Sequence, residues 1–253
     1  MIRLKKEKDI EGIRASGAIL ARVLHLLSSD VRAGISLAHF DERARALIRE
    51  AGAVPAFLGY RPPGADEPYP AALCTSVNHV VVHGLPTNLV LREGDLLTLD
   101  LGVSYNGYIT DAAITVGVPK VKPEIQRLLD VTERALAAGI FSCKRGGHLG
   151  DIGAAISAEI ENTGFSVVKG LTGHGVGFKL HEDPTVYNFG TWGEGIELQP
   201  GLVLAIEPMV SAGSPETKQL KDGSFVIRDG SVTAHFEHTV VITKNGVEIL
   251  TKI

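Results

Sequence analysis

The stretch DLLTLDLGVSYNGYITD, residues 95–111, decides the fold of this chain because it predicts a β-hairpin. Its Asn106 and Gly107 favour a two-residue turn in which both residues take a positive φ, and strand-like apolar residues flank this turn on both sides. With these two residues as the loop, Tyr105 pairs with Tyr108. The register of the whole hairpin follows from that pair.

Counting outward from the turn places Asp100 opposite Ala113 and Asp111 opposite Gly102. Because side chains alternate between the two faces of a strand, both aspartates project from one face, about 7–8 Å apart before their side chains converge. A gap of that size suits a cation. The opposite face carries apolar residues that we expect to pack against helices: Leu97, Leu99, Leu101 and Val103. An isolated pair of aspartates more often faces solvent, so the rest of the chain has to decide.

Apolar residues recur at helical spacing in four segments, which predicts four amphipathic helices. The segments are residues 7–28, 36–51, 123–142 and 149–163. The second and fourth segments are flanked in the same way, by Gly34 and Gly52 in one case and by Gly146 and Gly164 in the other. The chain therefore has the pattern of an internal duplication.

Strand-like stretches rich in β-branched and apolar residues follow each pair of helices, and in the second half they include Leu202–Val210 and Thr233–Thr243. Helices and strands segregated in this way predict an α+β fold with helices on one face of a sheet. We expect a single domain over residues 1–253. Its two halves, about 1–120 and 121–253, would be pseudo-symmetric and share one curved, mostly antiparallel sheet with the helices on its outer face.

The composition excludes several classes of function. Hydrophobic residues make up 44% and charged residues 21% of the 253 residues, as in soluble globular proteins. A net charge of -4 offers no basic surface to nucleic acid or to an anionic membrane. The N-terminus is charged and no apolar run is long enough for a signal peptide or a membrane span, so we expect a cytoplasmic protein. Two cysteines, Cys74 and Cys143, do not make a disulfide framework.

Three further residues place ionisable groups where burial is expected. His174 lies in the glycine-rich segment GLTGHGVG, where the backbone can approach a held imidazole closely. Glu207 and Glu237 interrupt the apolar patterns LVLAIEP and AHFEHTVVI. Buried carboxylates are costly when unpaired, and four acids gathered with one histidine would repel each other unless divalent cations balanced their charge. The sequence therefore predicts a metal site.

In combination these motifs resemble the methionine aminopeptidases of the pita-bread (creatinase/aminopeptidase) fold, and the resemblance runs over essentially the whole chain in the short bacterial type I form. It implies two divalent metal ions, with cobalt, manganese, iron and zinc as the candidates. The implied metal ligands are Asp100, Asp111, His174, Glu207 and Glu237. It further implies that Asp111 and Glu237 bridge the ions, that Asp100 binds one ion, and that His174 and Glu207 bind the other.

Two histidines outside the metal ligands match catalytic residues of this family: His83, in VVVHGLP, and His181, in LHEDP. The resemblance implies that a hydroxide bridging the metals attacks the scissile carbonyl and that Glu207 moves a proton to the leaving amine. It implies that His83 or His181 stabilises the developing oxyanion. Three other histidines match no role in the family: His79, His235 and His238.

The resemblance also implies a pocket for the methionine side chain, which Tyr60, Tyr69 and Cys74 would line. Cys74 is then a small, soft wall of the pocket, with no role as a nucleophile. The chain departs from the bacterial pattern at two aromatic positions. Leu180 stands where phenylalanine is frequent, and Phe225 is the candidate to replace an expected tryptophan.

These implications predict an enzyme that removes the N-terminal methionine from nascent polypeptides when the next residue is small, with the ribosome as the candidate place of action. We expect a monomer that binds neither nucleic acid nor membrane. Two alternatives stay open. One is a Xaa-Pro aminopeptidase or dipeptidase of the same fold, and the other is a metal-free binding module.

Overall fold

Helices and strands are segregated in this computed structural model, which describes residues 2–61 and 67–252. The helices are α1 (Glu7–Ser29), α2 (Leu37–Glu50), α3 (Pro123–Ser142) and α4 (Leu149–Ile160). The strands of the first half are β1 (Val54–Pro55), β2 (Leu73–Val77), β3 (Val80–Val82), β4 (Leu96–Tyr105) and β5 (Tyr108–Gly117). Those of the second half are β6 (Ser166–Val167), β7 (Gly173–Gly175), β8 (Glu182–Val186), β9 (Val203–Ile206), β10 (Met209–Ser211), β11 (Thr217–Gln219), β12 (Phe225–Ile227), β13 (Thr233–His235), β14 (His238–Thr243) and β15 (Gly246–Ile249).

Strands β4 and β5 form the predicted hairpin, and its register is confirmed. The observed pairs include Tyr105 with Tyr108, Asp100 with Ala113 and Gly102 with Asp111. Asn106 and Gly107 have φ values of 50° and 83°, as a two-residue turn of this type requires. The two aspartates therefore share one face of the hairpin.

The opposite face of β4 packs against α1 and α2, as expected. Leu97, Leu99 and Leu101 are fully buried and share one core cluster with Leu20 of α1 and Phe40 of α2. Each such side chain contributes about 1.5–3 kcal/mol when it is fully buried. A one-residue slip would turn all of these leucines out of the core, which makes the register costly to change.

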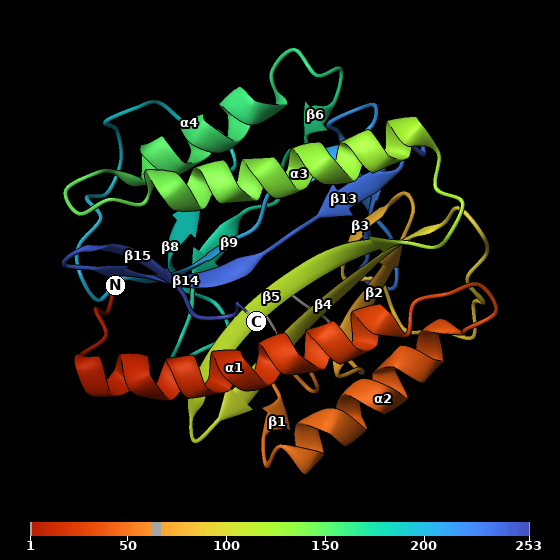
Figure 1. The fold of residues 1–253 in the computed structure, drawn as a ribbon, viewed down its shortest axis with the longest axis horizontal. Coiled ribbons are helices and arrows are strands. Elements are labelled where there is room, and N and C mark those ends of the chain that lie inside the picture. The colour runs from red at the N-terminus through yellow and green to blue at the C-terminus, as the bar shows by residue number, and fades with distance from the viewer. Residues whose placement is uncertain (1, 62–66, 253) are drawn as a thin grey trace.

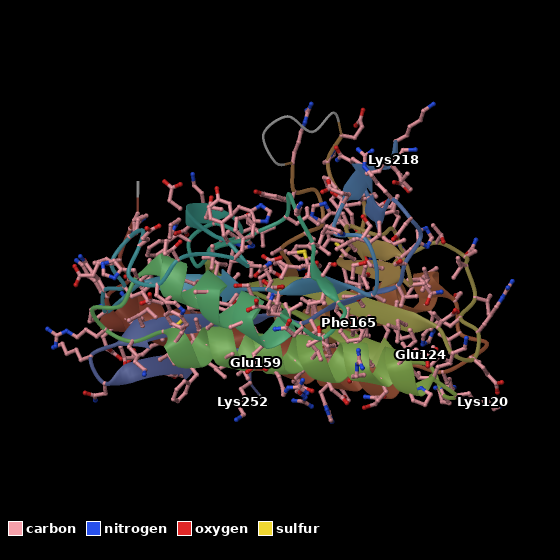
Figure 2. The ribbon with its side chains drawn as sticks, turned by 90° about the horizontal axis from the view of Figure 1, so that it is seen from above. Lys120, Glu124, Glu159, Phe165, Lys218 and Lys252 are labelled. Atoms are coloured by element: carbon pink, nitrogen blue, oxygen red, sulfur yellow. The ribbon has the colours of Figure 1, made fainter. Side chains whose placement is uncertain are left out.

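The helices lie on one side of the strands. Figure 1 shows α1 and α2 along one edge of the molecule and α3 and α4 along the other, with strands between them. Figure 2 shows that Lys218, on β11, lies on the side away from the helices. Every strand pairing among the described residues is antiparallel. The predicted α+β class is confirmed. No helix within the described ranges has the length and apolar character of a membrane span.

Helix α4 ends earlier than the predicted boundary at residue 163. Asn162 and Gly164 have φ values of 61° and 84°. A right-handed helix cannot continue through residues with positive φ, so the last turn of the predicted helix is a turn of another kind.

Two strands that the sequence predicted as continuous are broken in the structure. The stretch Leu202–Val210 divides into β9 and β10, and the stretch Thr233–Thr243 divides into β13 and β14. Pro208 lies in the first break, where its missing N–H cannot serve a strand ladder. The breaks coincide with Glu207 and Glu237, so each glutamate leaves the regular alternation of its sheet.

The two halves meet where β5 runs beside β14. The backbone N–H of Asp111 donates to Thr239 Oγ1 at 3.0 Å, and that hydroxyl donates to the carbonyl of Asp111 at 2.7 Å. The N–H of Glu237 donates to the carbonyl of Ala113 at 2.9 Å. This seam therefore places a carboxylate of the first half directly beside a carboxylate of the second.

A buried lysine ties the N-terminal segment to the loop before β8. Lys5 Nζ lies 2.7 Å from Glu182 Oε2, and the lysine side chain is only 1% exposed. The other carboxylate oxygen, Oε1, accepts hydrogen bonds from the N–H groups of Phe178 and Lys179 at 2.6 and 2.8 Å. This ion pair thus organises the loop that carries His181.

We expect Lys5→Met to lower the free energy of unfolding by about 3–5 kcal/mol, because the buried Glu182 carboxylate would lose its cation. Urea unfolding of the two proteins measures this difference. Lys120→Met is the matched control, since Lys120 pairs with Glu93 at the same 2.7 Å but the two side chains are 73% and 54% exposed. The control should lose at most about 1 kcal/mol. Equal losses in both variants would contradict the role given to burial.

Candidate metal centre

Five ionisable side chains converge on the face of the hairpin that points away from α1 and α2. Asp100 lies on β4, Asp111 on β5 and His174 on β7, whereas Glu207 follows β9 and Glu237 precedes β14. The four carboxylate residues are between 3% and 8% exposed. Each comes from a separate strand or strand end, so only the folded chain brings them together.

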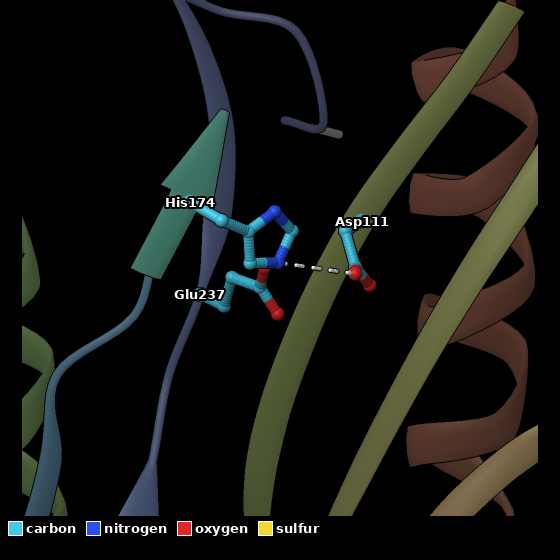
Figure 3. Close-up of side chains that lie close together, drawn as sticks. All are labelled: Asp111, His174 and Glu237. Atoms are coloured by element: carbon cyan, nitrogen blue, oxygen red, sulfur yellow. Dashed lines mark ion pairs between the residues drawn. The ribbon is translucent and has the colours of Figure 1, made fainter. Parts of the chain in front are cut away.

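Asp111, His174 and Glu237 form the tightest group, shown in Figure 3. Each offers one ligand atom, and these atoms all lie within 4.8 Å of one another. His174 Nε2 is 3.8 Å from Asp111 Oδ2 and 3.5 Å from Glu207 Oε1. These separations suit donors that share an ion, because ligand bonds of about 2.0–2.2 Å put neighbouring donor atoms roughly 3–4 Å apart.

Buried polar atoms without a partner mark the same place. Asp100 Oδ1, Asp111 Oδ1 and Glu237 Oε1 are buried, and no group in the described part of the chain donates a hydrogen bond to them. An unsatisfied buried acceptor costs about 1–3 kcal/mol, and more when it is charged. Divalent cations would satisfy these oxygens and balance their charge, so the residues fit a metal site.

Burial raises the pKa of all four carboxyl groups. The pKa of Asp111 rises to about 7 through loss of solvation. The pKa values of Asp100, Glu207 and Glu237 lie well above their ordinary values, first because of burial and then because of the negative charge of Asp111. Without cations, protons would have to neutralise this site.

His174 is poised as a neutral ligand. Burial lowers its pKa to about 4. Its Nδ1 lies 2.9 Å from the carbonyl oxygen of Gly175, which can only accept, so Nδ1 carries the proton. The lone pair of Nε2 is then directed at Asp111 and Glu207, which is the arrangement in which histidine binds metals.

His181 and His83 border this group. The rings of His181 and His174 are edge to face with centroids 4.3 Å apart, and the hydroxyl of Tyr60 lies 2.7 Å from His181 Nδ1. Both residues are partly open to solvent. Partial loss of solvation, with smaller contributions from His174 and His83, lowers the pKa of His181 to about 3. Loss of solvation also lowers the pKa of His83, whose ring packs against Phe225 with centroids 5.7 Å apart. Both imidazoles are therefore neutral at pH 7.

An apolar cluster adjoins His181 through Tyr60. Its buried members are Phe57, Cys74 and Leu180, and Ala56, Tyr60, Tyr69 and Ile109 pack against them. The cluster contains all three residues that the sequence predicted for the methionine pocket. Burial raises the pKa of the Cys74 thiol well above its ordinary value, which keeps it protonated and agrees with a role as a wall.

Some residues that lie beside this site were not predicted from the sequence, and one residue predicted for the pocket lies elsewhere. Phe57 and Ile109 were not predicted for the pocket. A Cβ atom on Gly102 would lie only 2.7 Å from Phe57 Cε1. The glycine within a strand was therefore the one sign in the sequence that another group packs closely against the hairpin at this point. Phe225 packs in another cluster beside His83, apart from Cys74. His235, which the motifs left without a role, lies next to Glu207.

The fold and its buried group of carboxylates and histidine define a metallopeptidase. The model of metallopeptidase family M24 matches residues 11–244, so the chain belongs to this family.

Within that family the chain groups with the methionine aminopeptidases. It is 44% identical to the methionine aminopeptidase of Clostridium perfringens over 100% of both chains, and 45% identical to that of Aquifex aeolicus over 100% of this chain and 99% of the other. The crystal structure of the methionine aminopeptidase from Thermotoga maritima matches with a TM-score of 0.95 and 40% identity over 100% of both chains. The predicted pita-bread fold is therefore confirmed.

Proline-directed enzymes share the fold at a greater distance. Prolidase from Pyrococcus furiosus matches with a TM-score of 0.78 but only 21% identity, and the match covers 99% of this chain and 65% of that one. This likeness supports a common fold alone, and the Xaa-Pro alternative is not favoured.

The metal-free protein should lose stability as pH rises from 7 to 8.5. A carboxyl group whose folded pKa is raised contributes stability that is complete below its unfolded pKa near 4 and is lost as pH rises through the folded pKa. The folded pKa is about 7 for Asp111 and lies well above the ordinary value for the other three. The buried histidines have lowered pKa values and give the opposite trend, but only below their unfolded pKa of about 6.5. Above pH 7, the change in stability with pH therefore reports on the carboxyl groups and not on the histidines.

Differential scanning calorimetry in the presence of a chelator measures this effect, and each group contributes at most about 1.4 kcal/mol per pH unit. Asp111→Asn should reduce the decline at the lower end of this window, near pH 7, because its titrating carboxyl group is removed. Excess Mn²⁺ should abolish the decline, since metal binding requires the deprotonated form. A Tm of the chelated protein that stays level or rises between pH 7 and 8.5 would rule out the raised pKa values.

Proposed function

We propose that this chain is a methionine aminopeptidase that removes the N-terminal methionine from polypeptides whose second residue is small. The observation that carries the proposal is a group of four buried carboxylates and one histidine that lies near an apolar cluster containing Cys74 and Leu180. Relatives named methionine aminopeptidase that match over the whole chain support the same conclusion. The reaction is hydrolysis of a terminal amide bond.

Two divalent ions are the proposed cofactor, held by Asp100, Asp111, His174, Glu207 and Glu237. The family resemblance makes Asp111 and Glu237 the proposed bridges, and their ligand atoms lie with that of His174 within 4.8 Å of one another. The oxygen-rich set with one imidazole suits manganese, iron, cobalt or zinc. When bound, such ions would polarise the scissile carbonyl and lower the pKa of the attacking water.

The protein's own groups would carry the proton transfers. Glu207 is a buried carboxylate within the proposed metal site, and a carboxylate in that place can accept a proton and return it. Its Oε1 faces His174 and its Oε2 faces His235. We assign Glu207 the transfer of a proton from the attacking water to the leaving amine.

His181 and His83 are the proposed donors to the developing oxyanion. If the hydroxyl of Tyr60 donates to His181 Nδ1, the ring carries its proton on Nε2, so that a neutral donor is available without any change of charge. Fixed donors of this kind stabilise a transition state more than a ground state because they need no reorganisation.

The apolar cluster beside His181 is the proposed pocket for the methionine side chain. Phe57, Tyr60, Tyr69, Cys74 and Leu180 provide an apolar lining with one soft sulfur atom. An unbranched thioether side chain adapts to such a lining and gains contacts with aromatic edges. The proposed substrates are nascent polypeptides in the cytoplasm. We propose that the enzyme is a monomer and that it acts on them at the ribosome.

The decisive test combines metal binding with product analysis. The chelated full chain is titrated with Mn²⁺ by calorimetry, and the loaded enzyme is then given Met-Ala-Ser and Ala-Pro-Ser peptides. We expect divalent metal to bind and methionine to be released from the first peptide only. Release from the Xaa-Pro peptide alone would favour the proline-directed alternative, and a chain that neither binds metal nor hydrolyses either peptide would be a binding module.

His181→Ala should lower kcat by about 100-fold and leave the Mn²⁺ dissociation constant unchanged, because an oxyanion donor contributes mainly in the transition state. Steady-state kinetics on Met-Ala-Ser and calorimetry measure the two quantities. His25→Ala is the control, since His25 is exposed on α1. Unchanged turnover in metal-replete His181→Ala would remove this residue from the mechanism.

A further inference from the structure

His235 is a buried histidine with no partner for its ring. The residue is 1% exposed, and neither Nδ1 nor Nε2 makes a hydrogen bond to any group in residues 2–61 or 67–252. An unsatisfied buried polar atom costs about 1–3 kcal/mol. Two such atoms in one side chain call for a functional or structural reason.

The backbone of His235 is held firmly while its ring is left unbonded. His235 pairs with Met209 between β13 and β10. Its N–H donates to Thr115 Oγ1 at 2.8 Å, and that hydroxyl donates to the carbonyl of His235 at 2.7 Å. The hydroxyl of Thr98 lies a further 2.8 Å away. The position of the ring is therefore set by two strands of the N-terminal hairpin and two of the second half.

Glu207 is the acidic group nearest to this ring. His235 Nε2 lies 3.6 Å from Glu207 Oε2, and His174 Nε2 lies 3.5 Å from Glu207 Oε1. The backbone of Glu207 is held as well, because Asn188 Nδ2 donates to its carbonyl at 3.0 Å. The Glu207 carboxylate thus lies between two imidazoles, one on each oxygen.

We propose that His235 is a positioning residue for Glu207, and that it donates a hydrogen bond from Nε2 to Glu207 Oε2 when metal is bound. This inference rests on the proposed role of Glu207 as a metal ligand. Oε1 then remains directed toward His174 and the metal site. Catalytic hydrogen bonds are often long in unliganded enzymes and shorten in the loaded state, so a separation of 3.6 Å is compatible with this contact.

The ring can serve as a neutral hydrogen-bond donor. A neutral imidazole has one N–H, and the Glu207 carboxylate is the acceptor in closest reach of Nε2. Carboxylates that bind metals are commonly oriented by hydrogen bonds of this kind, and loss of such a partner weakens metal binding about 10–100-fold.

The test measures Mn²⁺ affinity of the full chain by calorimetry after chelation. His235→Leu removes both ring nitrogens, and we expect it to weaken Mn²⁺ binding about 10–100-fold. His235→Gln retains an N–H donor and should restore binding to near the parent value. Urea unfolding of the chelated proteins separates this effect from stability, and His235→Met replaces His235→Leu if the latter does not fold.

A double-mutant cycle locates the effect. In a Glu207→Ala background, His235→Leu should weaken Mn²⁺ binding no further, because the group that it orients is absent. Parent-like affinity in His235→Leu, or equal losses in His235→Leu and His235→Gln, would overturn the proposal. An undiminished loss in the Glu207→Ala background would overturn it too, and would indicate that His235 binds metal itself. Failure of the proposed function is distinct, because the parent chain would then bind no metal.

Discussion

Four carboxylates and one imidazole share a small buried volume, and this concentration of negative charge is the constraint on which the rest of the structure depends. Each buried carboxylate would cost several kcal/mol if it were charged and unpaired. The raised pKa values of Asp111 and its three neighbours express that cost. A fold that places these groups together can only be an advantage to a protein that binds cations there.

The architecture meets this constraint with a hairpin that is anchored in the core and with two glutamates at breaks between strands. The hairpin of β4 and β5 is anchored on its other face by leucines in the helix-covered core. Glu207 and Glu237 lie at breaks between strands, where a side chain can turn toward the hairpin. Hydrogen bonds between Asp111 and Thr239 then join the two halves at the site itself. The first half of the chain thus provides Asp100 and Asp111, and the second half provides His174, Glu207 and Glu237.

Local rules predicted the hairpin well and the second half less well. The Asn106 and Gly107 turn determines the pairing of every residue in β4 and β5, because register propagates from a two-residue loop. No comparable signal marks the break at Glu207 except Pro208, and none marks the break at Glu237. The sequence alone assigned no role to Phe57 or His235, because a buried aromatic residue and a lone histidine have ordinary structural explanations until their neighbours are known.

What the sequence determined by itself is the set of local elements and the identity of the chemical groups: four helices, one hairpin with two aspartates on one face, and acids placed inside apolar patterns. The resemblance to a known family then connected those groups into a ligand set. Only the tertiary structure decided which atoms face each other. His174 Nε2 turns to Asp111 and Glu207, and His235 approaches the remaining oxygen of Glu207. The physical reason is that these contacts join residues far apart in the chain, and their geometry depends on how the two halves pack, which no local pattern encodes.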